Sequence, residues 1–437
     1  MPTIDLREHA RAALPVASGR VSTMAGGLIG SEILKIAAEI RAIVRSGRQV
    51  CNLTVGDFDP KQFPIPEALR KGIVAAYEAG ETNYPPSNGM PELREALPRF
   101  YERELGLVYP QESFLVASGA RPVIYGIYRA VLDPGDLVVV PVPSWNNNHY
   151  VHMVGARAAY VKCGPETRFL PGKSELVAQI PDARLVCLNS PLNPTGTAMA
   201  RDQVLGVSEA ILAENEKRAK AGRPPCYLMY DHIYWMLTAK GTRHWTPVEL
   251  VPEMARYTIF VDGISKAFAA TGVRVGWAVG PTDVIDRMSA MIGHIGAWAP
   301  RAEQVATAKL LDDPAAIRAY LEVLRAGLSL RLDALHEGFQ QMRASGLPVD
   351  SLSPEGAIYL TVRIAPFGKK APGGAALTTN EDVRRYVLEA AGVGLVPFQA
   401  FGVPSDEGWF RLSVGAVGER EIKDALPRLA EALRALG

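Results

Sequence analysis

Six short apolar runs, each separated from the next by a helical pattern or a long connection, dominate the middle of the chain. They occupy residues 114–117, 137–140, 185–189, 227–230, 259–261 and 275–279. Runs of this length are typical of buried strands, and their alternation with helices indicates an α/β protein with a mainly parallel sheet covered on both faces. Ligands bind beyond the carboxyl ends of strands in such sheets, so the residues after each run are candidates for a site.

The chain is too long for one small core, and its 437 residues favour two domains. Beyond about residue 305 the pattern changes to a long helix broken at 312–314, followed by short strands at 357–362 and 409–414. The prediction is an N-terminal segment that joins a small domain, a large ligand-binding domain and a C-terminal small domain, at residues 1–62, 63–305 and 306–437.

Composition disfavours several kinds of partner. Hydrophobic residues make up 48% of the chain and the net charge is +1, so nothing points to nucleic acid or an anionic membrane. No apolar stretch reaches the roughly 18 residues of a membrane span, and no cationic leader opens the chain. His149 and His152 lie close together, but no further ligand completes a metal site. The scattered cysteines are typical of a reduced protein, and we expect a cytoplasmic location.

The residues after the fifth run have the strongest chemical character. Lys266 follows that run on a turn of small residues, where partial desolvation would lower its pKa and free its amine to form a Schiff base. Arg274 is a forked cation suited to a phosphate. Taken alone, the two residues are more typical of a solvated surface, so the other strand ends are needed to distinguish the two interpretations.

The other strand ends offer an anion site, an aromatic ring, an amide and a carboxylate. Residues 118–124 open a helix whose free N–H groups favour an anion, and Trp145 could stack on a planar ring. Asn193 lies in a tight Asn-Pro turn, and Asp231, followed by Tyr234, ends an apolar run. Packing, turn geometry and helix capping are the structural alternatives for Trp145, Asn193 and Asp231.

A phosphorylated pyridine aldehyde is a ligand that would use every group offered by the strand ends. Its phosphate needs a helix N-terminus and a cation, and its ring needs a stacking partner. Its ring nitrogen needs a carboxylate that keeps it protonated, and its aldehyde needs a lysine. Each strand end has an ordinary explanation by itself, but five of them together are poorly explained in that way.

The motifs also occur in a characteristic order. They are Asn83-Tyr-Pro-Pro-Ser-Asn-Gly-Met-Pro-Glu-Leu-Arg94, Ser118-Gly-Ala, Pro-Ser-Trp145, Asn193-Pro-Thr-Gly196, Asp231-His-Ile-Tyr234, Ser265-Lys266, Thr-Gly-Val-Arg274-Val-Gly and Phe410-Arg411-Leu-Ser. This order resembles the class I and II aminotransferases, pyridoxal-phosphate enzymes of fold type I close to the aspartate aminotransferases. The resemblance spans roughly residues 28 to 430 and implies a seven-stranded, mainly parallel sheet flanked by helices, with a smaller α+β domain.

The resemblance implies a role for each residue around the cofactor ring. Lys266 would carry the cofactor aldehyde and move the proton from the substrate α-carbon to the cofactor. Asp231 would pair with the pyridine nitrogen, while Asn193 and Tyr234 would hydrogen-bond the ring oxygen. Trp145 would stack on the ring, and both Trp145 and Asn193 would also face the substrate.

The phosphate and the substrate carboxylate have their own sets of residues in this resemblance. Arg411, helped by the Gly56 N–H, would bind the substrate α-carboxylate. Tyr84 would reach the phosphate of the neighbouring subunit, which implies a homodimer with shared active sites. Four groups would hold the phosphate: the backbone N–H groups of Ala120 and Arg121, the Ser265 hydroxyl and the Arg274 guanidinium.

Arg121 bears on the choice of substrate. Some aspartate and prephenate aminotransferases of similar type carry a lysine in the matching segment, where it binds the distal carboxylate of acidic substrates. We hypothesise that Arg121 does the same, which favours aspartate or glutamate as amino donor, with an aromatic amino acid as the other option. A solvent-facing Arg121 side chain is the alternative, and Arg301 is a second candidate for the carboxylate.

Several positions depart from the family pattern. Gly263 occupies a position where some members carry a phosphate-binding serine. Phe398 replaces the more usual glycine and would reshape the substrate entrance. The loop at residues 365–379 is longer than is common.

Two other functional classes stay open. The same scaffold supports lyases, such as carbon–sulfur β-eliminating enzymes and aminocyclopropane-carboxylate synthases. A non-catalytic regulator on this fold would need a DNA-binding module ahead of it, and the roughly 30 residues before Gly30 are too few for one. The complete set of Lys266, Asp231 and Arg411 favours retained chemistry.

Overall fold

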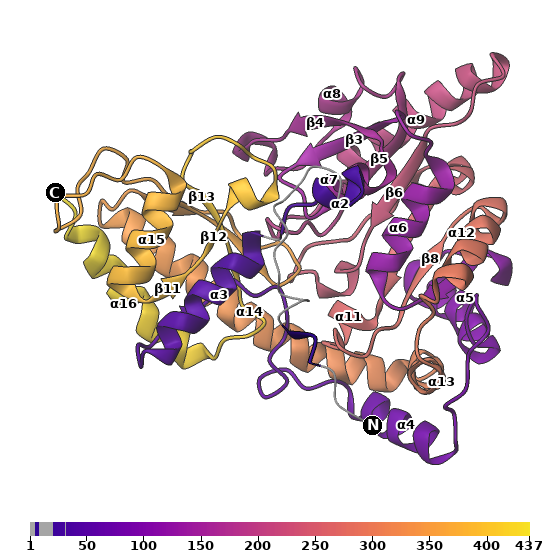
Figure 1. Ribbon diagram of the computed structural model, residues 1–437, viewed down its shortest axis with the longest axis horizontal. Helices are drawn as coiled ribbons and strands as arrows, with labels where there is room; N and C mark the ends of the chain where they lie inside the picture. Colours follow the sequence, from indigo (N-terminus) through magenta and orange to yellow (C-terminus); the bar gives the residue numbers. More distant parts are fainter. Residues whose placement is uncertain (1–4, 8–20, 31) are drawn as a thin grey trace.

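A seven-stranded sheet forms the centre of the larger body of the molecule (Figure 1). The computed structural model describes residues 5–7, 21–30 and 32–437. The strand order is β2-β8-β7-β6-β5-β3-β4, and β8 runs antiparallel to both of its neighbours while the other pairs are parallel. The strands are β2 Phe114–Ala117, β3 Leu137–Val142, β4 Arg157–Lys162, β5 Ala183–Asn189, β6 Tyr227–Asp231, β7 Thr258–Gly263 and β8 Gly276–Val279. The expected α/β class is confirmed.

Helices cover both faces of this sheet because alternate strand residues point to opposite sides. On one face Leu115 and Ala117 of β2 pack in an apolar cluster with residues of α6, α7 and α12. On the other face Phe114 and Val116 pack with residues of α5, α9 and α13. These helices are α5 Pro91–Leu105, α6 Ala120–Val131, α7 Asn147–Val154, α9 Arg201–Lys220, α12 Thr282–Ile295 and α13 Arg301–Leu311.

Strand β4 has no counterpart among the six predicted runs. It pairs only with β3, at the edge of the sheet, and its side chains are exposed or half-buried. An edge strand that contributes no fully buried residue lacks the apolar run by which the other six strands were recognised.

The smaller body contains two further sheets and lies on the left in Figure 1. One sheet has the strand order β12-β13-β10-β9, and the other pairs β1 in parallel with β11. Its strands are β1 Cys51–Asn52, β9 Val349–Ser351, β10 Tyr359–Ile364, β11 Val393–Gly394, β12 Val396–Pro397 and β13 Trp409–Ser413. Its main helices are α3 Glu32–Arg45, α14 Pro314–Ala344, α15 Asn380–Ala391 and α16 Glu419–Arg434.

Shorter elements connect these parts. They are α2 Thr23–Gly26, α4 Glu67–Glu78, α8 Lys173–Leu176, α10 Pro247–Leu250, α11 Ile264–Ala267, η1 Gln111–Ser113, η2 Pro165–Thr167, η3 Trp235–Leu237, η4 Pro252–Arg256 and η5 Phe398–Phe401. Helix α14 contacts both η3 and the strands β9 and β10, and so links the two bodies. The division at residues 62 and 305 stays a prediction, and residues 1–4, 8–20 and 31 of its first part lie outside the described residues.

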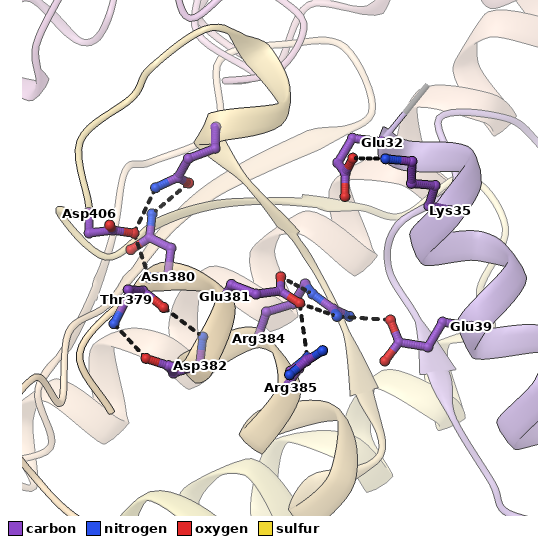
Figure 2. A network of polar contacts seen from close by, with 11 residues as sticks. Glu32, Lys35, Glu39, Thr379, Asn380, Glu381, Asp382, Arg384, Arg385 and Asp406 are labelled. Atoms are coloured by element: carbon purple, nitrogen blue, oxygen red, sulfur yellow. Dashed lines mark hydrogen bonds and ion pairs between the residues drawn. The ribbon is translucent and has the colours of Figure 1, made fainter. Parts of the chain in front are cut away.

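A polar network joins α3 to α15 in the smaller body (Figure 2). Arg384 of α15 pairs with Glu381 on the same helix at 2.7 Å and with Glu39 of α3 at 2.8 Å. Thr379 caps α15: its hydroxyl accepts the Asp382 N–H, and the Asp382 carboxylate accepts the Thr379 N–H. These contacts attach a helix near the N-terminus to the C-terminal part of the chain.

Membrane spans were sought in the described ranges 5–7, 21–30 and 32–437. None of the helices there combines the length and the hydrophobicity that a crossing requires.

Candidate active site

A cavity of about 370 Å³ lies at the carboxyl ends of the strands of the large sheet. Residues of both bodies line it, because Arg411 comes from β13 and most of the others come from turns after β2, β3, β5, β6 and β7. The structure thus brings together the strand ends as the sequence predicts. The predicted residues that line the cavity are Gly56, Ala120, Arg121, Trp145, Asn193, Asp231, Tyr234, Ser265, Lys266, Arg274 and Arg411.

Lys266 lies on α11, directly after β7. Its Nζ donates a hydrogen bond to the Gly56 carbonyl oxygen at 2.6 Å. Burial lowers the pKa of Lys266 to about 8; Asp57 opposes this shift, whereas the arginines of the cavity, including Arg411, add to it. A lysine with this pKa carries a substantial neutral fraction near pH 8, and a neutral amine can attack an aldehyde or accept a proton.

Asp231 ends β6 and points into the same cavity. Burial raises the pKa of Asp231 to about 7, while the Ile233 N–H, which donates to Oδ1 at 3.1 Å, and the charge of Lys266 lower it. The side chain therefore helps to form the local turn and also faces the cavity. A buried carboxylate that protein groups stabilise only in part favours a cationic partner, such as a protonated ring nitrogen.

Arg411 is a buried cation whose charge no carboxylate neutralises among the described residues. Its Nη1 donates to Asn193 Oδ1 at 3.1 Å, and its Nη2 donates to the Thr54 carbonyl oxygen at 2.6 Å. Its guanidinium lies 4.7 Å from the ring centre of Tyr359 and 4.9 Å from that of Phe401. The Nε is buried and has no hydrogen-bond partner in the part of the chain that the structure describes. Such a cation is suited to bind a carboxylate ligand.

Arg274 lies next to the turn before α6, an arrangement that is suited to an anion. The Arg274 guanidinium donates to the carbonyl oxygens of Ser118 at 2.9 Å and Thr271 at 2.7 Å. Gly119 has a φ of +87°, and a Cβ at this position would collide with the guanidinium, so a glycine is needed for this close approach. The start of a 12-residue helix next to a cation fits a phosphate.

Ser265 lines the cavity, whereas Gly263 has no room for the serine that some family members carry. A Cβ on Gly263 would lie 2.8 Å from Gly276 Cα, so a side chain there would push apart two strands. Ser265 is therefore the hydroxyl available to a phosphate on this turn, as the sequence indicates.

Arg121 and Trp145 form the rim of the cavity. The Arg121 guanidinium lies 4.8 Å from the Trp145 ring centre, and both residues line the cavity although Arg121 is exposed. The stack holds the cation at the mouth rather than leaving it free in solvent. This position is compatible with contact to the outer end of a substrate.

Tyr359 is a cavity residue that the sequence analysis missed. Its hydroxyl lies 2.7 Å from the Tyr234 hydroxyl, and it is buried next to Arg411. Asp57 was also missed, and its Oδ1 accepts a hydrogen bond from Thr271. Tyr359 lies at the start of an antiparallel strand of the smaller sheet, where the rule about parallel strand ends does not apply. A search for polar residues beside Gly56 would have found Asp57.

Three residues of interest do not line this cavity. Tyr84 is 83% exposed and meets the edge of the Trp298 ring at 5.7 Å. Arg301 pairs with Glu81 and does not line the cavity of a single chain, so its use as a second carboxylate site stays a prediction. Phe398 is buried in an aromatic cluster and does not line the cavity, so the expected effect on the substrate entrance is wrong.

The long loop at 365–379 lies at the surface of the smaller body. Most of its residues are exposed, and Lys370 exchanges two backbone hydrogen bonds of 3.0 Å with Gly437. The loop therefore contacts the C-terminal residue.

The fold and the cavity together indicate the class of enzyme. The cavity contains an amine of lowered pKa, a buried carboxylate and a cation suited to a carboxylate ligand. The chain belongs to the aminotransferase class I and II family, whose model matches residues 48–429. It is an aminotransferase, and enzymes of this family use pyridoxal phosphate. The lyase and regulator alternatives are not favoured.

Similar proteins support the assignment. The aspartate aminotransferase of Rhizobium meliloti (strain 1021) is 34% identical over 405 residues, which is 92% of this chain and 93% of that protein. The aspartate/prephenate aminotransferase of Thermus thermophilus is 32% identical over 410 residues, with 92% and 96% covered.

Solved structures agree in fold. The crystal structure of an aspartate aminotransferase from Rhizobium meliloti has a TM-score of 0.86 and 32% identity, with 96% of this chain and 100% of that chain covered. The Thermus thermophilus aspartate aminotransferase with maleate has a TM-score of 0.83 and 30% identity, with 94% and 99% covered.

Proposed function

We propose that this aminotransferase binds pyridoxal phosphate and transfers the amino group of aspartate or glutamate to a 2-oxo acid by a ping-pong mechanism. The observation that carries the proposal is the joint position of Lys266, Asp231 and Arg411 in one cavity. Together they supply an amine of lowered pKa, a buried carboxylate and an arginine without an acidic partner among the described residues.

The cavity has residues suited to each part of the cofactor. Asp231 would hold the ring nitrogen, and Asn193 and Tyr234 would donate to the ring oxygen, while Trp145 would cover the ring. The phosphate would lie between Arg274 and the start of α6, where it would also meet the Ser265 hydroxyl and the N–H groups of Ala120 and Arg121. When bound, the cofactor supplies a ring that accepts electrons from the substrate α-carbon.

Lys266 would supply both the attachment point and the base. Its Nζ would hold the cofactor aldehyde before substrate enters, and afterwards it would take the proton from the substrate α-carbon and return it. A pKa of about 8 suits both tasks, because a base is most effective when its pKa is near the working pH. Burial in the cavity also limits exchange of the transferred proton with bulk water.

Two arginines would bind the carboxylates of an acidic substrate. Arg411 would take the α-carboxylate in a bidentate pair, helped by the Gly56 N–H, because both line the cavity near Lys266. Arg121 at the rim would take the distal carboxylate. The solved relative with bound maleate, a dicarboxylate, supports this arrangement. An aromatic amino acid is the second candidate donor, since the same rim carries Trp145.

We also propose a homodimer with shared active sites and a cytoplasmic location. The 83% exposed ring of Tyr84, held against Trp298, is placed to contact a second copy of the chain. Four buried, free cysteines support a reducing compartment. Sedimentation of the wild type and of Tyr84→Phe would test the assembly, with cofactor affinity as the second measurement.

Half-reaction spectroscopy tests the proposed function. The protein reconstituted with pyridoxal phosphate should be yellow, lose this colour with aspartate and recover it with 2-oxoglutarate. Steady release of ammonia without recovery by a 2-oxo acid would instead identify a lyase. A panel of amino donors then separates acidic from aromatic preference. A wild type that cannot be reconstituted would contradict the proposal.

A further inference from the structure

A buried polar cluster lies under the active site without lining its cavity. Its centre is Asp262, the residue before the end of β7, which is 2% exposed. The carboxylate accepts three hydrogen bonds: from the Gly263 N–H at 2.7 Å, the Trp235 Nε1–H at 3.0 Å and the Tyr101 hydroxyl at 3.0 Å. The three donors come from the Lys266 turn, from η3 and from α5.

The cluster continues from Tyr101 to two histidines. The Tyr101 oxygen accepts from Trp277 Nε1 at 3.1 Å and lies 3.2 Å from Nε2 of His232, the residue that directly follows Asp231. His232 Nδ1 in turn lies 3.4 Å from His244 Nε2. The Nδ1 of His244 is buried and has no hydrogen-bond partner in the described structure.

These contacts determine where the hydrogens lie. The Tyr101 hydroxyl has one hydrogen, and donating it to Asp262 leaves its oxygen to accept from Trp277 and from His232 Nε2–H. His232 Nδ1 then accepts from His244 Nε2–H, and the atom left without a partner is only the lone pair of His244 Nδ1. The reverse order would bury an N–H of His244 without an acceptor, which is costly.

The same arrangement requires an ionised Asp262, because its three hydrogen-bond partners are all donors and His232 Nε2, which carries a hydrogen in this assignment, lies 3.7 Å from Oδ2. Burial raises the pKa of Asp262 to about 7, the charge of Asp231 adds to this rise and the three hydrogen bonds oppose it, so the carboxylate is charged in mildly alkaline solution. Burial of a charge contributes little to stability, since desolvation offsets the hydrogen bonds. The placement of this carboxylate therefore calls for an explanation other than stability.

The contacts of Asp262 join the two turns that carry the reacting groups. Trp235 lies four residues after Asp231 and next to Tyr234, and Gly263 lies three residues before Lys266. One carboxylate thus fixes both turns relative to each other. We propose that Asp262 is a positioning residue that sets the distance between Asp231 and Lys266 through Trp235 and the Gly263 N–H.

This proposal rests on the proposed function and is tested with Asp262→Asn. The amide has the same shape but can accept at only one of its two polar atoms, so it loses either the Gly263 contact at Oδ1 or the Trp235 and Tyr101 contacts at Oδ2. The variant should keep its fold, bind pyridoxal phosphate about tenfold more weakly and lose roughly 10- to 100-fold in kcat, as expected for a small displacement of reacting groups. The pH at which the absorbance of the bound cofactor changes should also shift. Trp235→Phe removes one of the two donors to Oδ2 without altering the carboxylate and should shift this pH in the same direction.

A matched control is Asn215→Asp. Asn215 is 2% exposed and exchanges hydrogen bonds of 2.7 and 2.9 Å with the backbone of Cys226, at the start of β6 and away from both turns. This control should lower the Tm but leave the spectral titration and kcat unchanged. If Asp262→Asn lowers the Tm and leaves the titration and cofactor affinity as in the wild type, the cluster is merely structural and the proposal is wrong.

The hydrogen assignment can be tested without cofactor. Nitrogen-15 NMR of the histidine side chains in the cofactor-free wild type should show His232 and His244 as neutral Nε2–H tautomers at pH 8. An Nδ1–H tautomer of His232 would mean that Tyr101 donates to it, which would overturn the role of Asp262. A wild type that never becomes yellow with pyridoxal phosphate would refute the proposed function, while this NMR result would still confirm or overturn the assignment.

Discussion

Two buried arginines of the smaller body, Arg384 and Arg411, differ in the groups that compensate their charge. Both side chains are almost fully buried, at 3% and 1% exposure. Arg384 has two carboxylate partners, Glu381 and Glu39, which tie α15 to α3 (Figure 2). Arg411 has an amide, a backbone carbonyl and two aromatic rings around it, and its Nε lacks a hydrogen-bond partner within residues 5–7, 21–30 and 32–437.

The difference separates a structural cation from a binding cation. A buried charge must be compensated, and around Arg384 the protein itself supplies the compensation. Around Arg411 the described residues compensate the positive charge only in part, which leaves the remaining compensation to a ligand. Lys266 and Asp231 line the same cavity. Burial of an arginine therefore does not by itself identify a ligand-binding site. The lack of a carboxylate partner among the described residues does.

The largest expected effect comes from Lys266→Ala. Turnover should fall by at least about a thousandfold, because both the cofactor attachment and the proton transfer depend on this amine. If Arg411 is a preformed carboxylate site, this variant should still bind a dicarboxylate. Isothermal titration with maleate, in the presence of pyridoxal phosphate, would measure this. Lost binding together with lost turnover would contradict the independence of Arg411.

Arg411→Leu should lower kcat/KM by a factor that corresponds to a loss of about 3–5 kcal/mol in transition-state binding, since the substrate carboxylate would lose its buried cation. Its free energy of unfolding should be unchanged or higher, because the substitution removes a buried charge that lacks an acidic partner in the described structure. Steady-state kinetics and urea unfolding measure the two quantities. A loss of stability equal to or larger than that of Arg384→Leu would show that Arg411 is structural.

Arg121→Ala tests whether the rim of the cavity determines the choice of substrate. If Arg121 binds the distal carboxylate, the variant should lose about 2–4 kcal/mol of transition-state binding for aspartate relative to an aromatic amino acid. This loss is measured as a fall in the ratio of the two kcat/KM values. The ratio of the two specificity constants, measured in parallel, is the readout. An unchanged ratio would assign the residue to the stack on Trp145 alone.

Arg384→Leu should produce the opposite pattern from Arg411→Leu. Its partners are half-exposed and can be hydrated, so the loss of stability should be modest, about 1–2 kcal/mol. Activity should stay within about threefold of the wild type, since Arg384 does not line the cavity. A selective loss of kcat/KM would break the distinction between the two arginines.

The smallest effect concerns pH. The wild-type rate of cofactor uptake should rise with pH through a midpoint near 8 and level off above it, because burial lowers the pKa of Lys266 to about 8 and the neutral amine attacks the aldehyde. Arg411 contributes to this lowering, since a nearby cation disfavours the charged amine. Stopped-flow measurements should therefore place the midpoint at higher pH in Arg411→Leu but not in Arg384→Leu.

Much of the site could be predicted from sequence because its residues are local to strand ends. Lys266, Asp231 and Asn193 each follow a buried run within a few residues, and parallel strands bring their carboxyl ends to one edge. β4 could not be predicted in this way, since an exposed edge strand has no apolar run. Tyr359 was missed because it lies on an antiparallel strand of the other body.

The sequence by itself determined six of the seven strands of the large sheet, its mainly parallel character and the order of the polar residues after the strands, since these depend on local apolar pattern and turn chemistry. The tertiary structure alone decided which charges are compensated. Arg384 acquires Glu39 from a helix 345 positions away along the chain, and Arg411 meets Asn193 from 218 positions away. Asp262 likewise gains two of its three donors from distant elements, Tyr101 from α5 and Trp235 from η3. Compensation of a buried charge depends on packing between distant segments, and no local pattern records it.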